Sequence, residues 1–242
     1  LGSLYQRNGL TLSVALALGL ALFLALAMLR QGTLWGAPVA GGFYAVFPHN
    51  LMVSLFAPIF LFAVLALALG VRRFWRDVTP ATSGAGLTSP AAAEAAHAAL
   101  RLKYLDGGHG EGCHNEDDAW THARRRYHHL TFYGFMLCFA ATSVATLYHY
   151  VLGWPAPYDL TTLPKLLGVI GGVCLAVGTA GLWRLNLRRH PDHGDAAQKP
   201  MDRGFITLLF LVSVTGLLLW LLGQTAAMPV MLAVHLGSVM AL

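Results

Sequence analysis

The sequence predicts an all-α fold: a polytopic bundle of about six transmembrane helices, the last one truncated, with a cytoplasmic loop that contains a short helix. Composition is the first observation, with 56% hydrophobic residues, only 11% charged residues and a mean hydropathy of +0.58. An ordinary soluble domain has about 25% charged residues. The second observation is that long apolar runs recur, each close to the roughly 20 residues that cross a hydrocarbon core of about 30 Å.

We expect these runs to form one membrane domain over residues 1–242. The predicted spans are 10–29, 49–70, 130–152, 163–183, 205–223 and 229–242. The chain opens with Leu1 rather than Met and stops at Leu242 inside the sixth run, so we expect it to be an internal piece of a longer protein.

The basic residues predict the orientation of the bundle. With the N-terminus in the cytoplasm, only Arg30 and Lys165 of the 16 lysines and arginines fall on the outer side. This distribution follows the positive-inside rule. It also explains the net charge of +5 without a polyanionic partner, so no nucleic-acid binding is expected.

The main polar region is the predicted cytoplasmic loop 71–127. It opens with the linker "DVTPATSGAGLTSP", after which Ser89 and Pro90 resemble an N-cap and first helical residue. The helix is expected to run through "AAAEAAHAALRLKYL" and to end at "DGG". Next comes "GGHGEGCHNEDDAWTHARRR", which is either a solvated anchor at the lipid headgroups or a docking surface for a redox partner.

The cysteines give no sign of an iron–sulfur cluster within this chain. Cys113, Cys138 and Cys174 form no CxxC pair, and "EGCH" lacks the first cysteine of a CxxCH haem-attachment motif.

The titratable groups expected inside the spans are histidines. Ionisable residues in a span are costly and therefore mark candidate functional sites. Neutral imidazoles with no neighbouring carboxylate are typical of bis-histidine b-type haem ligation between facing helices. The alternative is that histidines at helix ends only bond to water, headgroups or backbone.

Helix geometry orders the candidates. His128 and His149 are 21 residues apart, which places them about 31 Å apart along one helix and about 60° apart around its axis. His129 lies about 160° from His149 around the same axis. His235 is expected about 10 Å below the outer surface, where it and His149 can ligate one haem iron. His128, or else His129, is the inner candidate, and His49 is a reserve ligand.

Three segments carry a family resemblance. They are "KYLDGGHGEGCHNEDDAWTHARRRYHHLTFYGFMLCFAATSVATLYHY" (103–150), "KPMDRGFITLLFLVSVTGLLLWLL" (199–222) and "MLAVHLGSVMAL" (231–242). They closely resemble the membrane part of the tricarballylate-utilisation B proteins, also called citrate-utilisation B proteins. The resemblance runs from about Leu10 to Leu242, although the first two spans match only in kind.

The resemblance implies a function. Members of this family are similar to electron carriers that couple a flavin-dependent dehydrogenase, which oxidises tricarballylate, to the membrane quinone pool. Their N-terminal domain carries iron–sulfur clusters, and their cytochrome-b-like membrane domain is similar to the nitrate reductase gamma subunit. The cluster domain does not lie within these 242 residues, so no cluster ligand can be transferred. By resemblance, His149 and His235 are the outer ligand pair and His128 or His129 is the inner ligand.

The sequence therefore predicts a membrane electron-transfer component of an oxidoreductase system rather than a self-contained enzyme. It would hold one or two b-type haems in the bacterial inner membrane. The alternative is a haem-free anchor that docks a soluble dehydrogenase to the membrane. A tricarboxylate transporter is disfavoured because no cationic side chain is expected within a span to receive the carboxylates.

Overall fold

A computed structural model describes residues 8–35, 42–79, 88–193 and 195–242, and these residues form helices joined by short connections. The α-helices are α2 (Asn8–Gln31), α3 (Phe43–Val46), α4 (His49–Val78), α5 (Ser89–Leu100), α6 (Ala123–Tyr150), α7 (Leu163–Arg188), α8 (Lys199–Leu222) and α9 (Met228–Ala241). Two short 3-10 helices cover Lys103–Asp106 and Pro191–His193. The described residues contain no β-strand, so the predicted all-α class is confirmed.

Five helices are long and apolar enough to cross a membrane, namely α2, α4, α6, α7 and α8, and α9 is a shorter apolar helix. This is the pattern of a multi-pass membrane protein. Helices extend beyond the predicted spans. For example, α4 continues to Val78, past residue 70, and α6 begins at Ala123, before residue 130. Arginine and histidine can extend such a helix because their polar tips reach the headgroup layer while their stems stay on apolar surface.

The chain divides into two compact units, one of residues Leu1–Val46 and Tyr104–Leu242 and the other of Phe47–Lys103. The smaller unit contains α4 and α5. The cap of α5 is Thr88, whose Oγ1 accepts a hydrogen bond from the Ala91 amide at 3.4 Å, and not Ser89 as predicted. The α-helix also ends earlier than expected, at Leu100, before the first 3-10 helix. Residues 80–87 of the predicted linker lie outside the described part of the chain.

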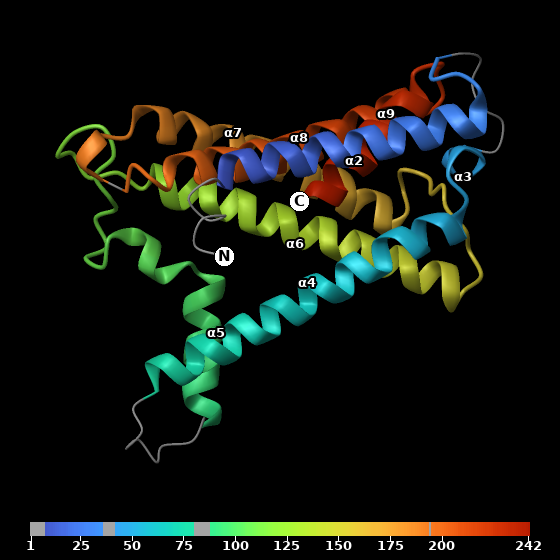
Figure 1. The fold of residues 1–242 in the computed structure, drawn as a ribbon. Coiled ribbons are helices and arrows are strands. Elements are labelled where there is room, and N and C mark those ends of the chain that lie inside the picture. Colours follow the sequence, from blue (N-terminus) through green and yellow to red (C-terminus); the bar gives the residue numbers. More distant parts are fainter. Residues whose placement is uncertain (1–7, 36–41, 80–87, 194) are drawn as a thin grey trace. The chain divides into compact units, whose positions relative to one another are not determined.

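In the larger unit, α6 packs on α7, α7 on α8, and α8 and α9 on α2 (Figure 1). Contacts between helix ends give their directions. Gly204 near the start of α8 faces Leu12 near the start of α2, so these two helices are parallel. Asn186 near the end of α7 accepts a hydrogen bond from Arg203 Nε of α8 at 2.9 Å, so α7 and α8 are antiparallel. Within this unit the alternation is that of the predicted topology.

Glycines allow the closest helix contacts of this unit. A Cβ on Gly134 of α6 would lie 2.6 Å from the Leu175 backbone nitrogen of α7. Likewise, a Cβ on Gly19 of α2 would lie 2.5 Å from the Gly237 carbonyl oxygen of α9. Small residues let helix backbones approach in lipid, where dispersion contacts and not the hydrophobic effect drive association. The positions of α6 against α7 and of α9 against α2 are therefore fixed by backbone contact.

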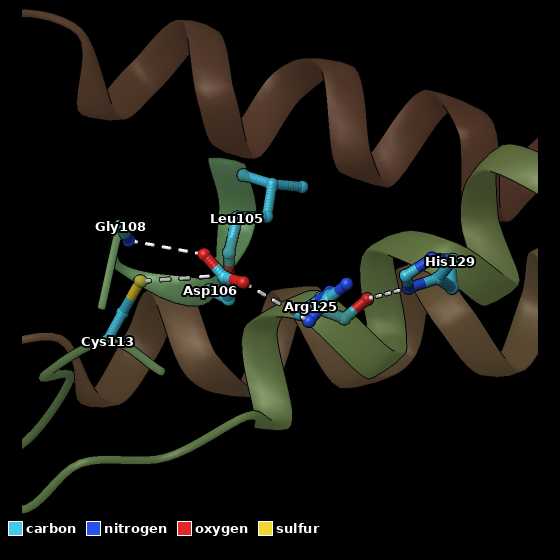
Figure 2. Close-up of polar contacts among 6 residues, drawn as sticks. All are labelled: Leu105, Asp106, Gly108, Cys113, Arg125 and His129. Atoms are coloured by element: carbon cyan, nitrogen blue, oxygen red, sulfur yellow. Dashed lines mark hydrogen bonds and ion pairs between the residues drawn. The ribbon is translucent and has the colours of Figure 1, made fainter. Parts of the chain in front are cut away.

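The segment between the first 3-10 helix and α6 is tied to α6 (Figure 2). Asp106 Oδ2 forms an ion pair with Arg125 Nη1 at 3.5 Å, and its Oδ1 accepts a hydrogen bond from the Gly108 amide at 3.2 Å. The Cys113 thiol points to the Leu105 carbonyl at 3.9 Å. Backbone bonds between Cys113 and Thr121 close this segment, which leads directly into α6. The segment between the first 3-10 helix and α6 is thus a folded cap on the start of α6.

This cap provides a test of the predicted orientation. In a Cys138→Ala, Cys174→Ala background, Cys113 should be protected from an impermeant maleimide in intact cells and should react in inside-out vesicles. The reason is that the basic residues place this end of the bundle in the cytoplasm. Labelling is read by the mass shift of the purified protein, and equal labelling in intact cells would show that the topology is inverted.

Candidate functional site

A cavity of about 470 Å³ lies among α6, α7, α8 and α9, and we call it the outer cavity because the topology places it toward the outer side. Its walls are mainly apolar. Its polar side chains are Thr142, Lys165, Ser213 and His235. Both its size and its apolar lining with a few polar groups are typical of small-molecule and cofactor sites, which measure roughly 300–1,000 Å³.

His235 of α9 borders this cavity and is held by α8. Its Nδ1 lies 3.1 Å from Thr215 Oγ1, and the same hydroxyl donates to the Leu211 carbonyl at 2.6 Å. Because the hydroxyl proton is used on Leu211, Thr215 accepts from an Nδ1–H of His235. The Nε2 atom therefore carries the free lone pair, which is the arrangement of a histidine ready to ligate a metal.

Gly216 makes room for this ring. A Cβ at residue 216 would lie 3.0 Å from His235 Cε1 and 3.5 Å from its Nδ1. The glycine lets the imidazole lie against the backbone of α8, one residue after Thr215. The position of His235 is thus fixed by one hydrogen bond and one close backbone contact.

Lys165 lies at the end of the outer cavity that the topology places nearest the membrane surface, in the first turn of α7. Its Nζ stands 5.8 Å from the ring centroid of Trp220 on α8, a distance that allows a cation–π contact.

A second cavity, of about 520 Å³, lies among the opposite ends of α6, α7 and α8, and we call it the inner cavity. His128 of α6 lines it, and the His128 Nδ1 atom is buried with no hydrogen-bond partner among the described residues. The other polar and charged side chains of its lining are Arg124, Thr131, Thr179, Asn186, Arg189 and Asp202. Leucine, isoleucine, methionine and phenylalanine side chains complete the walls.

The neighbouring histidines His128 and His129 differ in their surroundings. His129 lines neither of the two cavities, its Nδ1 lies 3.0 Å from the Arg125 carbonyl, and its ring stacks on Tyr133 at 6.0 Å (Figure 2 shows His129 with Arg125). Of the two predicted inner candidates, His128 is the one that borders a cavity.

His149 and His49 are placed differently from His235. His149 lies in the last turn of α6, with its ring edge against Tyr150 at 4.9 Å, and it does not line the outer cavity. His49 is the first residue of α4 and belongs to the smaller unit. His149 does not line the outer cavity that His235 borders, and their pairing on one iron stays a prediction.

Sequence reasoning missed the residues that position and surround the histidines. Thr215 lies 20 residues before His235, and their contact depends on how α8 and α9 are aligned. Arg124 was interpreted as an orienting charge within a segment that either anchors at the headgroups or docks a redox partner. Arg189 was interpreted only as an orienting charge, yet both line the inner cavity. A glycine directly after a threonine within an apolar span was the available signal for Thr215.

Comparison with known proteins gives the family. The family model described as citrate utilization protein B matches residues 4–242. A curated protein of Escherichia coli, named citrate utilization protein B, is 55% identical over 241 residues, which cover 100% of this chain and 62% of that relative. This chain thus spans less than two thirds of the length of the relative. No solved structure matches it significantly. The chain belongs to the citrate utilization protein B family.

Proposed function

We propose that this chain is the membrane electron-transfer part of a citrate or tricarballylate utilisation system in the bacterial inner membrane. It would take electrons from a flavin-dependent dehydrogenase through iron–sulfur clusters and pass them to quinone by way of b-type haem. The name of the relative supports the metabolic setting. The five apolar helices support the membrane setting.

The observation that carries the proposal is the setting of His235. Its Nδ1 bonds to Thr215, which leaves the lone pair of Nε2 free to bind a metal. Its ring borders an apolar cavity of about 470 Å³. A neutral imidazole nitrogen would hold the iron of a b-type haem, and a hydrogen bond on the other ring nitrogen fixes the ring orientation. The residues present therefore fit a haem ligand.

His128 at the inner cavity extends the proposal to a second haem. The two histidines line separate cavities, one toward each predicted membrane surface. Electron transfer across a bilayer requires redox groups on both sides of the apolar layer, and two cavities at different depths meet that need.

The residues of the chain supply ligation and environment. When bound, b-type haem supplies reversible one-electron transfer, and the protein sets its orientation, potential and exposure to water. His235 Nε2 would bind iron and Thr215 would hold the imidazole. Water would be kept from the site by apolar side chains that line the outer cavity, among them Phe135, Val212 and Leu217. Because a bis-histidine haem would take a second imidazole, His149 remains the first candidate for the second ligand at the outer cavity and His49 the reserve.

A reduced-minus-oxidised absorption spectrum of the purified full-length protein tests this function. We expect the sharp bands of a low-spin b-type haem and one or two haems per chain by pyridine haemochrome. Membranes without the protein provide the control. An inserted, folded protein without haem bands would leave the haem-free anchor as the function.

A further inference from the structure

The lining of the inner cavity carries an excess of positive charge. Arg124, the second residue of α6, and Arg189, the residue after α7, both line it, and Asp202 of α8 is its one acidic lining residue. Arg189 is close enough to Arg124 to repel it, and Asp202 is close enough to attract it. The lining of this otherwise mostly apolar cavity thus contains two guanidinium groups and one carboxylate.

Neutral groups hold Arg124 in place. Its Nη2 donates to Asn115 Oδ1 at 3.0 Å. Asn115 is only 4% exposed, and it is fixed in turn by its Nδ2 donating to the Leu185 carbonyl at 3.2 Å and by its own carbonyl accepting from the His190 amide at 2.8 Å. This network positions the guanidinium without neutralising its charge.

Arg189 has a buried donor. Its Nε is buried and has no hydrogen-bond partner among the described residues. A buried donor without a partner is costly, and it is more so beside a second positive charge. Among the described residues, no ion pair offsets this cost at Arg189.

Neighbouring arginines are paired differently. Arg125 forms an ion pair with Asp106 at 3.5 Å, and Arg188 forms one with Glu116 at 3.4 Å. Within the described ranges, neither Arg124 nor Arg189 has a carboxylate within 4.0 Å. Of these four arginines, the two without an ion pair are the two that line the cavity, which a solvated headgroup anchor does not explain.

We propose that Arg124 and Arg189 bind the propionate carboxylates of the haem whose iron is ligated by His128. This proposal rests on the proposed function. The occupant must have an anionic end for the arginines, an apolar body for the leucine and phenylalanine walls, and a use for the imidazole of His128. Haem has all three features, whereas an anionic lipid would satisfy the charge and the apolar walls but leave His128 without a role.

Single glutamine substitutions in the full-length protein test the proposal, each beside a matched control. Arg189→Gln is compared with Arg188→Gln, and Arg124→Gln with the exposed Arg126→Gln. The readout is a potentiometric titration of the haem that is lost in His128→Ala. Removing a nearby cation disfavours the added electron, so we expect at least a tenfold fall in the ratio of reduced to oxidised haem at the wild-type midpoint. For one electron this is a shift of about 59 mV to lower potential.

Arg189→Lys should restore most of that ratio because it keeps the charge, and the controls should change it less than twofold. The second haem, the one lost in His235→Ala, serves as the folding check in each variant. If either glutamine variant fails this check, the other glutamine variant and Arg189→Lys decide.

Wild-type protein without any haem would overturn the proposed function and this inference with it. Haem that is present but unchanged in potential in both glutamine variants would overturn the inference alone. Loss of thermal stabilisation by phosphatidylglycerol vesicles in these variants, with no change in haem potential, would instead assign the arginines to a lipid phosphate and would also overturn it.

Discussion

Replacing His235 with alanine is expected to abolish one haem signal of the full-length protein while leaving membrane insertion intact. The substitution removes the one imidazole among the residues that line the outer cavity. No second imidazole lies in that lining: Ser213 and Thr142 offer only neutral hydroxyls, and the Cys138 thiol or the Lys165 amine would give a haem other than a bis-histidine one. Haem per chain by pyridine haemochrome and the reduced spectrum measure the loss.

Thr215→Val provides the graded companion to this substitution. It is close in shape to threonine but removes the hydroxyl that lies 3.1 Å from His235 Nδ1. Loss of such an outer-shell partner typically lowers metal affinity by about 10–100-fold, so partial occupancy is expected. Thr207→Val on the same helix, outside the lining of either cavity, is the control. Full haem content in His235→Ala would show that His235 is not a ligand.

The same assay identifies the second ligand at the outer cavity. The sequence predicts that His149→Ala removes the same signal as His235→Ala. If instead His49→Ala removes this haem signal and His149→Ala does not, the second ligand is His49 of α4. His149 would then have no role in haem ligation. A protein in which neither substitution matters would have its second ligand outside the residues proposed.

The spans could be predicted because their signal is local. The length of an apolar run shows whether it can cross a bilayer, and this length can be read without knowing how the rest of the chain folds. The helices α4 and α6 extend beyond the predicted spans for a related reason. Val78 and Ala123 lie beyond charged residues, which hydropathy excludes although an α-helix tolerates them at the headgroup layer.

The site was predicted only in its histidines. An ionisable residue in a span is visible in the sequence. However, which histidine borders which cavity depends on the register of neighbouring helices. Gly216 and Thr215 set that register between α8 and α9 through contacts 19 and 20 residues apart in the chain, which no periodicity reveals.

Depth explains why His149 and His235 do not line one cavity. His235 is the eighth residue of α9, about 10 Å from its start. The part of α6 that lines the same cavity extends from Phe135 to Thr142. His149 lies seven residues later, about another 10 Å along α6, so two histidines near one surface differ in depth by about two helical turns.

Gly134→Ala should destabilise the bundle, although alanine is the better helix former. Its Cβ would lie 2.6 Å from the Leu175 nitrogen and 2.9 Å from the Gly171 carbonyl oxygen, both in the backbone of α7. A backbone atom cannot rotate away as a flexible side chain can, so α6 and α7 must separate along their contact. Overpacking of this kind costs roughly 1–3 kcal/mol, and about 2–4 °C of Tm accompanies each kcal/mol in a chain of this size.

Gly168→Ala is the matched control for Gly134→Ala, because it adds the same methyl group to the same pair of helices. At residue 168 the new Cβ would lie 3.7 Å from the Ala141 Cβ, an ordinary van der Waals contact. Alanine there gains up to about 1 kcal/mol of helix propensity without a clash, so Tm should stay level or rise. Thermal unfolding of both variants in the same detergent, followed by tryptophan fluorescence, gives the comparison. A Gly134→Ala protein that melts no lower than Gly168→Ala would show that α6 and α7 do not meet backbone to backbone at Gly134. The inner cavity that these helices enclose with α8 would then have a different shape.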